Sequence, residues 1–209
     1  MKHLTGILSL FLCAALPLYA AGLDDLTWTT TNGEVTITDC DTDATDELVI
    51  PDTIDGNPVS GIGEEAFRNC RNLTSITIPD SVTSIGEAAF RECTSLTSIS
   101  IGNSVTSIGR LAFRDCTNLS SITIPDGVTS IGYQAFYRCE SLTSVVIGNG
   151  VTSIGDQAFR DCTSLTSITI PDGVTFIGVQ AFYRCESLTA ITFQGAAPTV
   201  GVEAFLNVP

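Results

Sequence analysis

Lysine and histidine are nearly absent from this chain of 209 residues, which contains one of each, Lys2 and His3. Without its first residues the chain has neither, which excludes Ser-His-Asp and Cys-His catalysis, Schiff-base lysines, imidazole metal ligands and Walker-type phosphate loops. Basic residues are scarce overall, with 9 Lys and Arg against 23 Asp and Glu, and the formal net charge is −14. Because such a chain repels phosphate, we expect no nucleic-acid partner.

Long apolar runs are absent after residue 22. Residues 1–22 carry two basic residues, an apolar run over Leu4–Leu18 and then small residues, which is the layout of a secretory signal peptide. The run is shorter than the ~20 residues of a membrane-spanning helix. We therefore expect cleavage between Ala20 and Leu23, no membrane span in the mature chain, and a secreted, extracellular or cell-surface location.

One unit of 23 residues, I-G-x-x-A-F-x-x-C-x-x-L-T-S-I-x-I, repeats along most of the chain. The Ala-Phe pair recurs at Phe67, Phe90, Phe113, Phe136, Phe159, Phe182 and Phe205. A cysteine column keeps the same register at Cys70, Cys93, Cys116, Cys139, Cys162 and Cys185. Every second unit differs at one position, where Pro79, Pro125 and Pro171 alternate with Gly102 and Gly148. Repeats of this length predict a solenoid.

Each unit has the pattern of a short strand followed by other elements. Leu73–Ile78 alternates apolar and polar residues and predicts a strand, which Pro79 then ends. Val82–Ile85 is a second short extended stretch, and residues 87–93 have apolar positions three or four apart, which predicts a helical turn. One such unit cannot bury its apolar face alone. The sequence therefore predicts an α/β solenoid, a right-handed stack of about seven 23-residue coils, each a short strand plus a helical turn.

The repeated unit resembles the BspA-like class of leucine-rich repeats over about Leu48–Pro209, and residues 48–59 look like a lengthened first unit of that class. The resemblance implies a secreted or surface-exposed scaffold for protein–protein interaction or adhesion, with no fixed catalytic residues and no cofactor. It implies an extracellular partner, either a host, neighbouring-cell or matrix protein or a glycan.

A β-hairpin is predicted before the repeats, because Asn32-Gly33 separates two alternating runs. Its residues Trp28, Val35 and Ile37 would cover the open end of the first coil, although Trp28 could instead be a lone ligand-binding aromatic. The predicted organisation is a signal peptide at 1–22, an N-terminal β-hairpin cap at 23–47 and leucine-rich repeats at 48–209.

Asp39, Asp41 and Asp43 are spaced like the first ligands of a calcium loop. The glycine and glutamate that such a loop needs are replaced by Ala44 and Ile50. We therefore expect a solvated acidic turn rather than a metal site.

The cysteine column could be a framework of disulfides or metal ligands. Equivalent residues of adjacent coils lie about 4.8 Å apart with parallel Cβ directions, which suits neither a disulfide nor a tetrahedral zinc site. With Cys40 the mature chain has an odd number of cysteines. We expect free thiols that pack as small buried hydrophobes.

Paired carboxylates for glycoside hydrolysis are available by residue type. Asp80, Asp126 and Asp172, however, recur at one repeat position, as solvated turn residues do. We expect no enzymatic activity.

Small hydroxyl side chains are predicted to cover the outward face of the strands. The candidate binding face is the column Thr77, Ser100, Thr123, Val146, Thr169 and Thr192, with a second column at Ser75, Ser98, Ser121, Ser144, Ser167 and Ala190. This pattern also suits any exposed strand. A polysaccharide-binding or purely structural envelope module that uses the Thr/Ser face is therefore the alternative function. The opposite side would carry Arg and Tyr beside carboxylates, as exposed ion pairs.

The last unit ends after its Ala-Phe pair, without the following Cys and Leu. The strand Leu188–Phe193 should therefore be only partly covered by residues 198–209. We expect either a truncated gene product or an end-to-end homodimer through this C-terminal coil.

Overall fold

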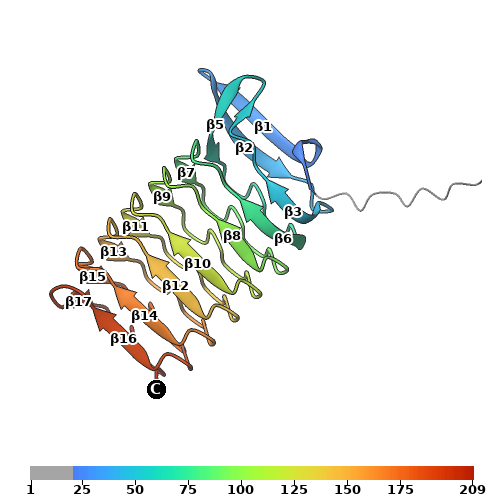
Figure 1. Cartoon of the computed structure of the whole chain (residues 1–209). Helices are drawn as coiled ribbons and strands as arrows, with labels where there is room; N and C mark the ends of the chain where they lie inside the picture. Colours follow the sequence, from blue (N-terminus) through green and yellow to red (C-terminus); the bar gives the residue numbers. More distant parts are fainter. Residues whose placement is uncertain (1–20) are drawn as a thin grey trace, which may run out of the picture.

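The computed structural model describes residues 21–209, which form coils stacked along one axis (Figure 1). Within these residues the chain is a right-handed β-solenoid of about seven coils of roughly 23 residues, which confirms the predicted stack. The predicted signal peptide at residues 1–22 lies almost wholly outside the described residues, so its cleavage stays a prediction.

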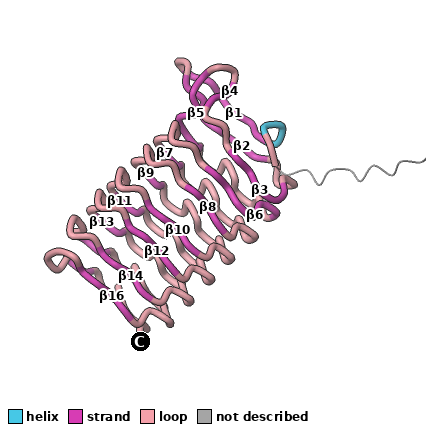
Figure 2. The backbone as a smooth tube through the Cα atoms, in the orientation of Figure 1, coloured by secondary structure: helices cyan, strands magenta, loops and turns pink. Residues whose placement is uncertain are grey.

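Two columns of strands run along the stack (Figure 2). The first strand column contains β1 (Leu26–Thr31), β2 (Glu34–Cys40), β5 (Asn57–Ile62), β7 (Ser84–Ile85), β9 (Ser107–Ile108), β11 (Ser130–Ile131), β13 (Ser153–Ile154), β15 (Phe176–Ile177) and β17 (Thr199–Val200). The second strand column contains β3 (Thr45–Val49), β6 (Asn72–Thr77), β8 (Ser98–Ser100), β10 (Ser121–Ile124), β12 (Ser144–Ile147), β14 (Ser167–Ile170) and β16 (Ala190–Phe193). The short strand β4 (Thr53–Ile54) pairs with β5 in antiparallel orientation.

Strands of successive coils pair in parallel with a shift of one repeat. Ser121 pairs with Ser144, and Ile154 pairs with Ile177. Along β10 and β12 exposed and buried residues alternate: Ile122, Ile124, Val145 and Ile147 point inward, and Ser121, Thr123, Ser144 and Val146 point out. The register therefore places each inward residue on its own equivalent in the next coil.

The predicted hairpin is confirmed at the N-terminal end. Strands β1 and β2 are antiparallel, and β2 continues the stack by pairing in parallel with β5. The connecting residues Asn32 and Gly33 have φ of 54° and 80°, as a two-residue hairpin turn requires. Val35 and Ile37 are fully buried and Trp28 packs, partly buried, against the core, so the hairpin covers the first coil.

The predicted helical turn in each coil is wrong. The third side of the coils consists of consecutive turns, here named the turn column, at residues 64–69, 87–92, 110–115, 133–138, 156–161, 179–184 and 202–207. Within residues 21–209 the only helix is the 3₁₀ helix η1 (Leu23–Asp25), which precedes the cap hairpin. The solenoid is therefore built from strands and turns, and the α/β class is corrected to a β-solenoid.

Backbone hydrogen bonding explains why no helix forms. The N–H groups of Leu111 and Phe113 donate to the carbonyls of Tyr133 and Ala135 in the next coil, at 2.9 and 2.8 Å. A helix would use these donors for carbonyls four residues back. Leu111 and Asp115 both have φ of 60°, a left-handed conformation that costs about 1–2 kcal/mol per residue. The hydrogen bonds between coils hold the chain in this conformation.

The core is a set of identical columns. The phenylalanine rings from Phe67 to Phe205 stack in sequence, with centroid distances from 5.0 to 5.3 Å and interplanar angles from 3° to 14°. The rings of the six inner coils are fully buried. Leu, Ile and Cys columns surround them, so each coil buries its apolar face only against its neighbours.

Adding one methyl group at Gly109 is expected to destabilise the stack. A Cβ atom there would lie 2.5 Å from the backbone C and O of Gly86 in the preceding coil, and the backbone cannot move without breaking the register. We expect Gly109→Ala to lower the free energy of unfolding by about 1–3 kcal/mol, as overpacking does. Urea denaturation measures this. Gly61→Ala is the control, because its new Cβ would be 3.4 Å from the nearest atoms, and an equal loss there would contradict the explanation.

Candidate functional site

The predicted binding face is on the surface of the second strand column. Ser100, Thr123, Val146, Thr169 and Thr192 are exposed, and Thr77, nearest the cap, is half-buried. In the part of the chain that the structure describes, Thr123 and Thr169 have no hydrogen-bond partner for their hydroxyl groups. The face is therefore open, and its use in binding stays a prediction.

A different set of hydroxyl groups stabilises the stack. Five residues beside the second strand column each donate a hydroxyl hydrogen bond to the backbone carbonyl of the equivalent residue in the preceding coil. They are Thr97, Ser120, Thr143, Thr166 and Thr189. The bond from Thr143 to the Ser120 carbonyl is 3.0 Å long. Part of the hydroxyl-rich surface is therefore structural, which the sequence pattern could not separate from the free column.

A shallow hollow of about 540 Å³ lies where β10, β12 and β14 end, and we name it the rim notch. It is lined by Asn103, Thr123, Ile124, Pro125, Asp126, Val145, Val146, Ile147, Gly148, Asn149, Thr169, Pro171 and Gln194. Three members of the predicted binding face, Thr123, Val146 and Thr169, are among them. The structure thus brings the middle of that face together with the turns that follow the strands.

Proline and glycine alternate along the edge of the notch. Pro125 and Pro171 are in its lining, in the coils on either side of Gly148. A Cβ on Gly148 would collide with the carbonyl group of Pro125, so the position requires glycine. The two-unit period in the sequence was visible, but its effect depends on this contact between coils.

The chemistry of the notch is mixed. Val146 is 55% exposed in a column that, from Thr77 to Thr192, carries hydroxyl groups at all other positions, so it offers an apolar contact. Asp126 is the one charged residue of the lining, and its Oδ1 accepts a hydrogen bond from the Asn149 backbone N–H at 2.8 Å. The notch contains no pair of carboxylates and no nucleophile beside a base, so its arrangement suits recognition rather than catalysis.

The predicted acidic turn is a separate feature in the cap. Asp41 Oδ1 accepts a hydrogen bond from the Asp43 backbone N–H at 2.9 Å, and Asp39 Oδ1 accepts one from the Cys40 N–H at 3.0 Å. Among residues 21–209 no three His, Cys, Asp or Glu side chains are placed to hold a metal ion. These three aspartates therefore form local turns, and the structure adds no geometry for calcium.

The cysteine column lies in the core, where Cys40, Cys70, Cys93, Cys116, Cys139, Cys162 and Cys185 are all buried free thiols. The thiol of Cys139, for example, donates to the Phe113 carbonyl at 3.2 Å. Burial raises the pKa of Cys139 and Cys162 well above the ordinary thiol value, and it raises the pKa of Cys185 to about 12. These groups are therefore protonated, weak nucleophiles at neutral pH.

Arginine and tyrosine stack on one another in the turn column, which the sequence analysis did not predict. The guanidinium carbon of Arg160 lies 5.9 Å from the ring centre of Tyr137 and 4.6 Å from that of Tyr183, and Arg114 lies 5.0 Å from Tyr137. Aligning the sequence by its repeat would have shown that Arg and Tyr alternate at this position.

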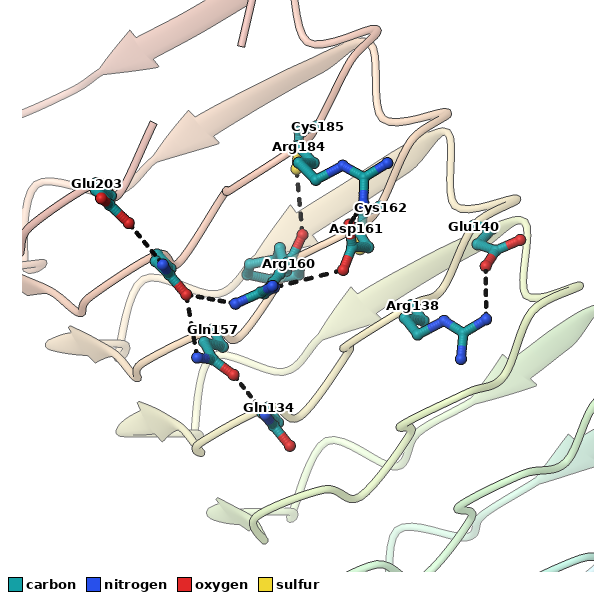
Figure 3. A network of polar contacts seen from close by, with 12 residues as sticks. Gln134, Arg138, Glu140, Gln157, Arg160, Asp161, Cys162, Arg184, Cys185 and Glu203 are labelled. Carbon is teal, nitrogen blue, oxygen red and sulfur yellow. Dashed lines mark hydrogen bonds and ion pairs between the residues drawn. The ribbon is translucent and has the colours of Figure 1, made fainter. Parts of the chain in front are cut away.

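A ladder of amide side chains runs from coil to coil along the turn column (Figure 3). Gln157 Nε2 donates to Gln180 Oε1 at 3.2 Å, and Gln180 Nε2 donates to Glu203 Oε2 at 2.6 Å. Asp161 accepts from both Arg160 and Arg184 at 3.4 Å. The polar groups of this side pair with one another, so the ladder ties coils together.

The two sides of the solenoid differ in charge. All eight arginines lie in the turn column or, for Arg71, directly after it. The second strand column has no basic residue, and Asp80, Asp126 and Asp172 occupy equivalent exposed positions just after its strands. The rim notch therefore lies on an acidic side of the molecule.

The C-terminal coil has the exposed face that the sequence predicted. Phe193, Val200, Val202 and Leu206 are exposed, and β16 and β17 each pair with one strand only. End-to-end dimerisation through this face stays a prediction.

Comparison with known proteins identifies the repeat. The model of the BspA type leucine rich repeat region matches residues 44–162 and 129–209, with six copies. None of the curated proteins matches the chain. Within residues 21–209, no helix is long and apolar enough to span a bilayer.

Several solved structures are similar. A leucine-rich repeat protein of T. pallidum is 31% identical, with 91% of each chain covered and a TM-score of 0.85. A leucine-rich cell surface protein from Faecalibacterium prausnitzii is 34% identical over 82% of this chain and 53% of its own, with a TM-score of 0.62. A leucine-rich repeat protein from Bacteroides ovatus is 31% identical over 86% of this chain and 54% of its own, with a TM-score of 0.61. The chain spans about half the length of the last two.

Proposed function

Because the chain belongs to the BspA-type leucine-rich-repeat family, we propose that it is a surface-exposed or secreted scaffold that binds an extracellular protein through the rim notch. Members of this family are repeat scaffolds of bacterial surface-type proteins that generally serve protein interaction. The family is not known for enzymatic activity, so catalysis is not part of the proposal.

The exposed Val146 is the observation that carries the proposal. It is an exposed apolar residue in an outward column of mostly hydroxyl groups, and unlike Val49, which is in register with Thr77 at the start of this column, it lies in the rim notch. Apolar contacts surrounded by polar groups are typical of protein-binding sites. The hydroxyl groups of Thr123 and Thr169 flank it and are free to bond a partner.

The similarity to a leucine-rich cell surface protein supports an extracellular or surface location. The signal-peptide layout of residues 1–22 also supports export from the cell. Adhesion to a host, neighbouring-cell or matrix protein is the form of binding that we propose.

A charged substitution at Val146 is expected to abolish binding to a protein partner. The test is an array of purified matrix proteins, cell-surface proteins and polysaccharides, followed by surface plasmon resonance on each protein that binds. We expect Val146→Arg to raise the Kd at least tenfold, because it places a long charged side chain on the apolar contact of the notch.

Val202→Arg is the matched control, since Val202 is 72% exposed in the turn column of the last coil and is not part of the notch lining. Equal loss in both variants would contradict a site at the notch. Binding only to polysaccharides, lost when Thr77, Thr123 and Thr169 are replaced by alanine, would overturn the protein-binding proposal in favour of the glycan-binding alternative.

A further inference from the structure

The charge around the rim notch selects among possible partners. Asp126 is the only ionisable residue of its lining, and Oδ1 of this carboxylate already bonds the Asn149 backbone N–H. The lining contains no basic residue, and the arginines are in or beside the turn column, where Arg110 stacks on Tyr133 and the others are in ion pairs, for example Arg114 with Asp115 at 3.1 Å. An acidic partner would therefore meet repulsion at the notch without a free cation to offset it, whereas a basic partner finds an open carboxylate.

The spacing of the aspartate carboxylates along the solenoid indicates the spacing of basic groups along a partner chain. Asp80, Asp126 and Asp172 occupy the same position in every second coil. Successive coils are separated by the distance of their stacked rings, 5.2 Å between Phe90 and Phe113 and 5.2 Å between Phe113 and Phe136. The carboxylates therefore recur about every 10 Å, which is close to one turn of a polyproline II helix, where three residues span about 9 Å and every third side chain lies on the same face.

The lining of the notch indicates which partner residues fit between the basic side chains. Val146 is exposed there and offers an apolar contact that suits an aliphatic side chain, and the largely buried Pro125 and Pro171 lie on either side in the lining. The side chains of Asn149 and Gln194 lie in the same lining and can bond the amide groups of a peptide.

Building on the proposed function, we propose that the rim notch binds a polypeptide segment in the extended polyproline II conformation that runs along the solenoid axis. The segment carries lysine or arginine at every third residue, with an aliphatic side chain between the charges seated on Val146. The basic side chains pair with Asp126 and with the equivalent aspartates of the neighbouring coil pairs.

Synthetic peptides test this directly by fluorescence anisotropy. The first probe is Lys-Ser-Val-Lys-Ser-Val-Lys, the second has the same composition with its three lysines contiguous, and the third replaces lysine by glutamate. We expect the spaced peptide to bind more tightly than the contiguous one, and the acidic peptide not to bind. Higher salt should weaken the binding of the spaced peptide, because salt screens exposed charge pairs.

One conservative substitution links binding to the notch. Asp126→Asn keeps an acceptor for the Asn149 N–H and removes the charge, so we expect the Kd of the spaced peptide to rise about threefold to fivefold. Glu186→Gln is the control. It also removes one negative charge, but at a residue that follows the turn column, so the Kd of the spaced peptide should not change.

The outcomes separate this inference from the proposed function. Equal affinity for the spaced and contiguous peptides, or no effect of Asp126→Asn, would overturn the inferred charge pattern. If no peptide binds while proteins of the array still bind through Val146, the extended basic partner is wrong and the protein-binding notch stands. If the array too contains no protein that depends on Val146, the proposed function itself fails.

Discussion

Raising the pH from 8 to 10 is expected to unfold the protein, because its core contains a row of buried thiols. Burial raises the pKa of Cys116, Cys139, Cys162 and Cys185 above the ordinary value, and a hydrogen bond with Cys116 together with burial raises the pKa of Cys93. In the unfolded chain a thiol loses its proton near pH 8.5. Above that pH the unfolded state binds fewer protons than the folded state, so the free energy of unfolding falls as the pH rises.

The size of the effect follows from the number of thiols. For each thiol that stays protonated in the folded state, the free energy of unfolding falls by about 1.4 kcal/mol per pH unit above about pH 8.5. At pH 10 the loss is therefore about 2 kcal/mol per thiol. Five such groups together approach the whole stability of a typical domain, about 5–15 kcal/mol. The loss continues up to the folded pKa, which is about 12 for Cys185. Below pH 8 both states keep the protons, and the thiols add no pH dependence.

Urea denaturation at pH 7, 8, 9 and 10, with a reductant that keeps the thiols free, measures this dependence. Cys139→Ala is the matched variant, because it removes one fully buried thiol from the middle of the row. Its free energy of unfolding should fall less steeply above pH 8.5, by about 1.4 kcal/mol per pH unit. A stability that stays constant from pH 8 to pH 10 would contradict buried free thiols.

Removing the central ring of the phenylalanine column is expected to have the largest effect of any single core substitution. Phe136 is fully buried and stacks on Phe113 at 5.2 Å and on Phe159 at 5.1 Å. Phe136→Ala should lower the free energy of unfolding by about 3–5 kcal/mol through lost burial and the cavity that remains. The two lost ring pairs add about 0.5–1.5 kcal/mol each. Urea denaturation followed by circular dichroism gives the loss.

Phe205→Ala is the comparison at the end of the column. Phe205 stacks only on Phe182, at 5.3 Å, and is partly buried. The loss there should be clearly smaller, because one ring contact disappears and water can fill the space. Equal losses at the two positions would mean that the stack does not transmit stability between neighbouring coils.

The strand parts of the fold could be predicted from the sequence because they depend on local pattern. Ile122 and Ile124 alternate with Ser121 and Thr123, which indicates a strand whichever coil lies beside it. The hairpin at Asn32-Gly33 is equally local. These predictions needed no knowledge of the neighbouring chain.

The turn column could not be predicted in this way. Apolar residues three or four apart, such as Ala112, Phe113 and Cys116, occur both in a helix and in consecutive turns. The choice is made by the N–H groups that reach the next coil, as at Phe113, and such contacts lie 22 or more residues away in sequence. The stacking of Arg160 on Tyr183 depends on the same register.

The candidate site was predicted in part. The exposed column with Thr123, Val146 and Thr169 follows from strand alternation. The hollow does not, because it arises where Gly148 packs on the Pro125 carbonyl group, a contact between coils that no local pattern contains.

The alternation of proline and glycine means that the solenoid lengthens most simply by two coils at a time. Inserting a pair of coils keeps each glycine beside a proline, so we expect a chain lengthened by two coils to fold, whereas a single added coil would place two prolines or two glycines in adjacent coils. Each added pair also adds one gap between prolines along the same edge. A longer protein of this kind would then offer several equivalent contacts to a repetitive partner, and its binding strength would rise through avidity without any change in the individual contact.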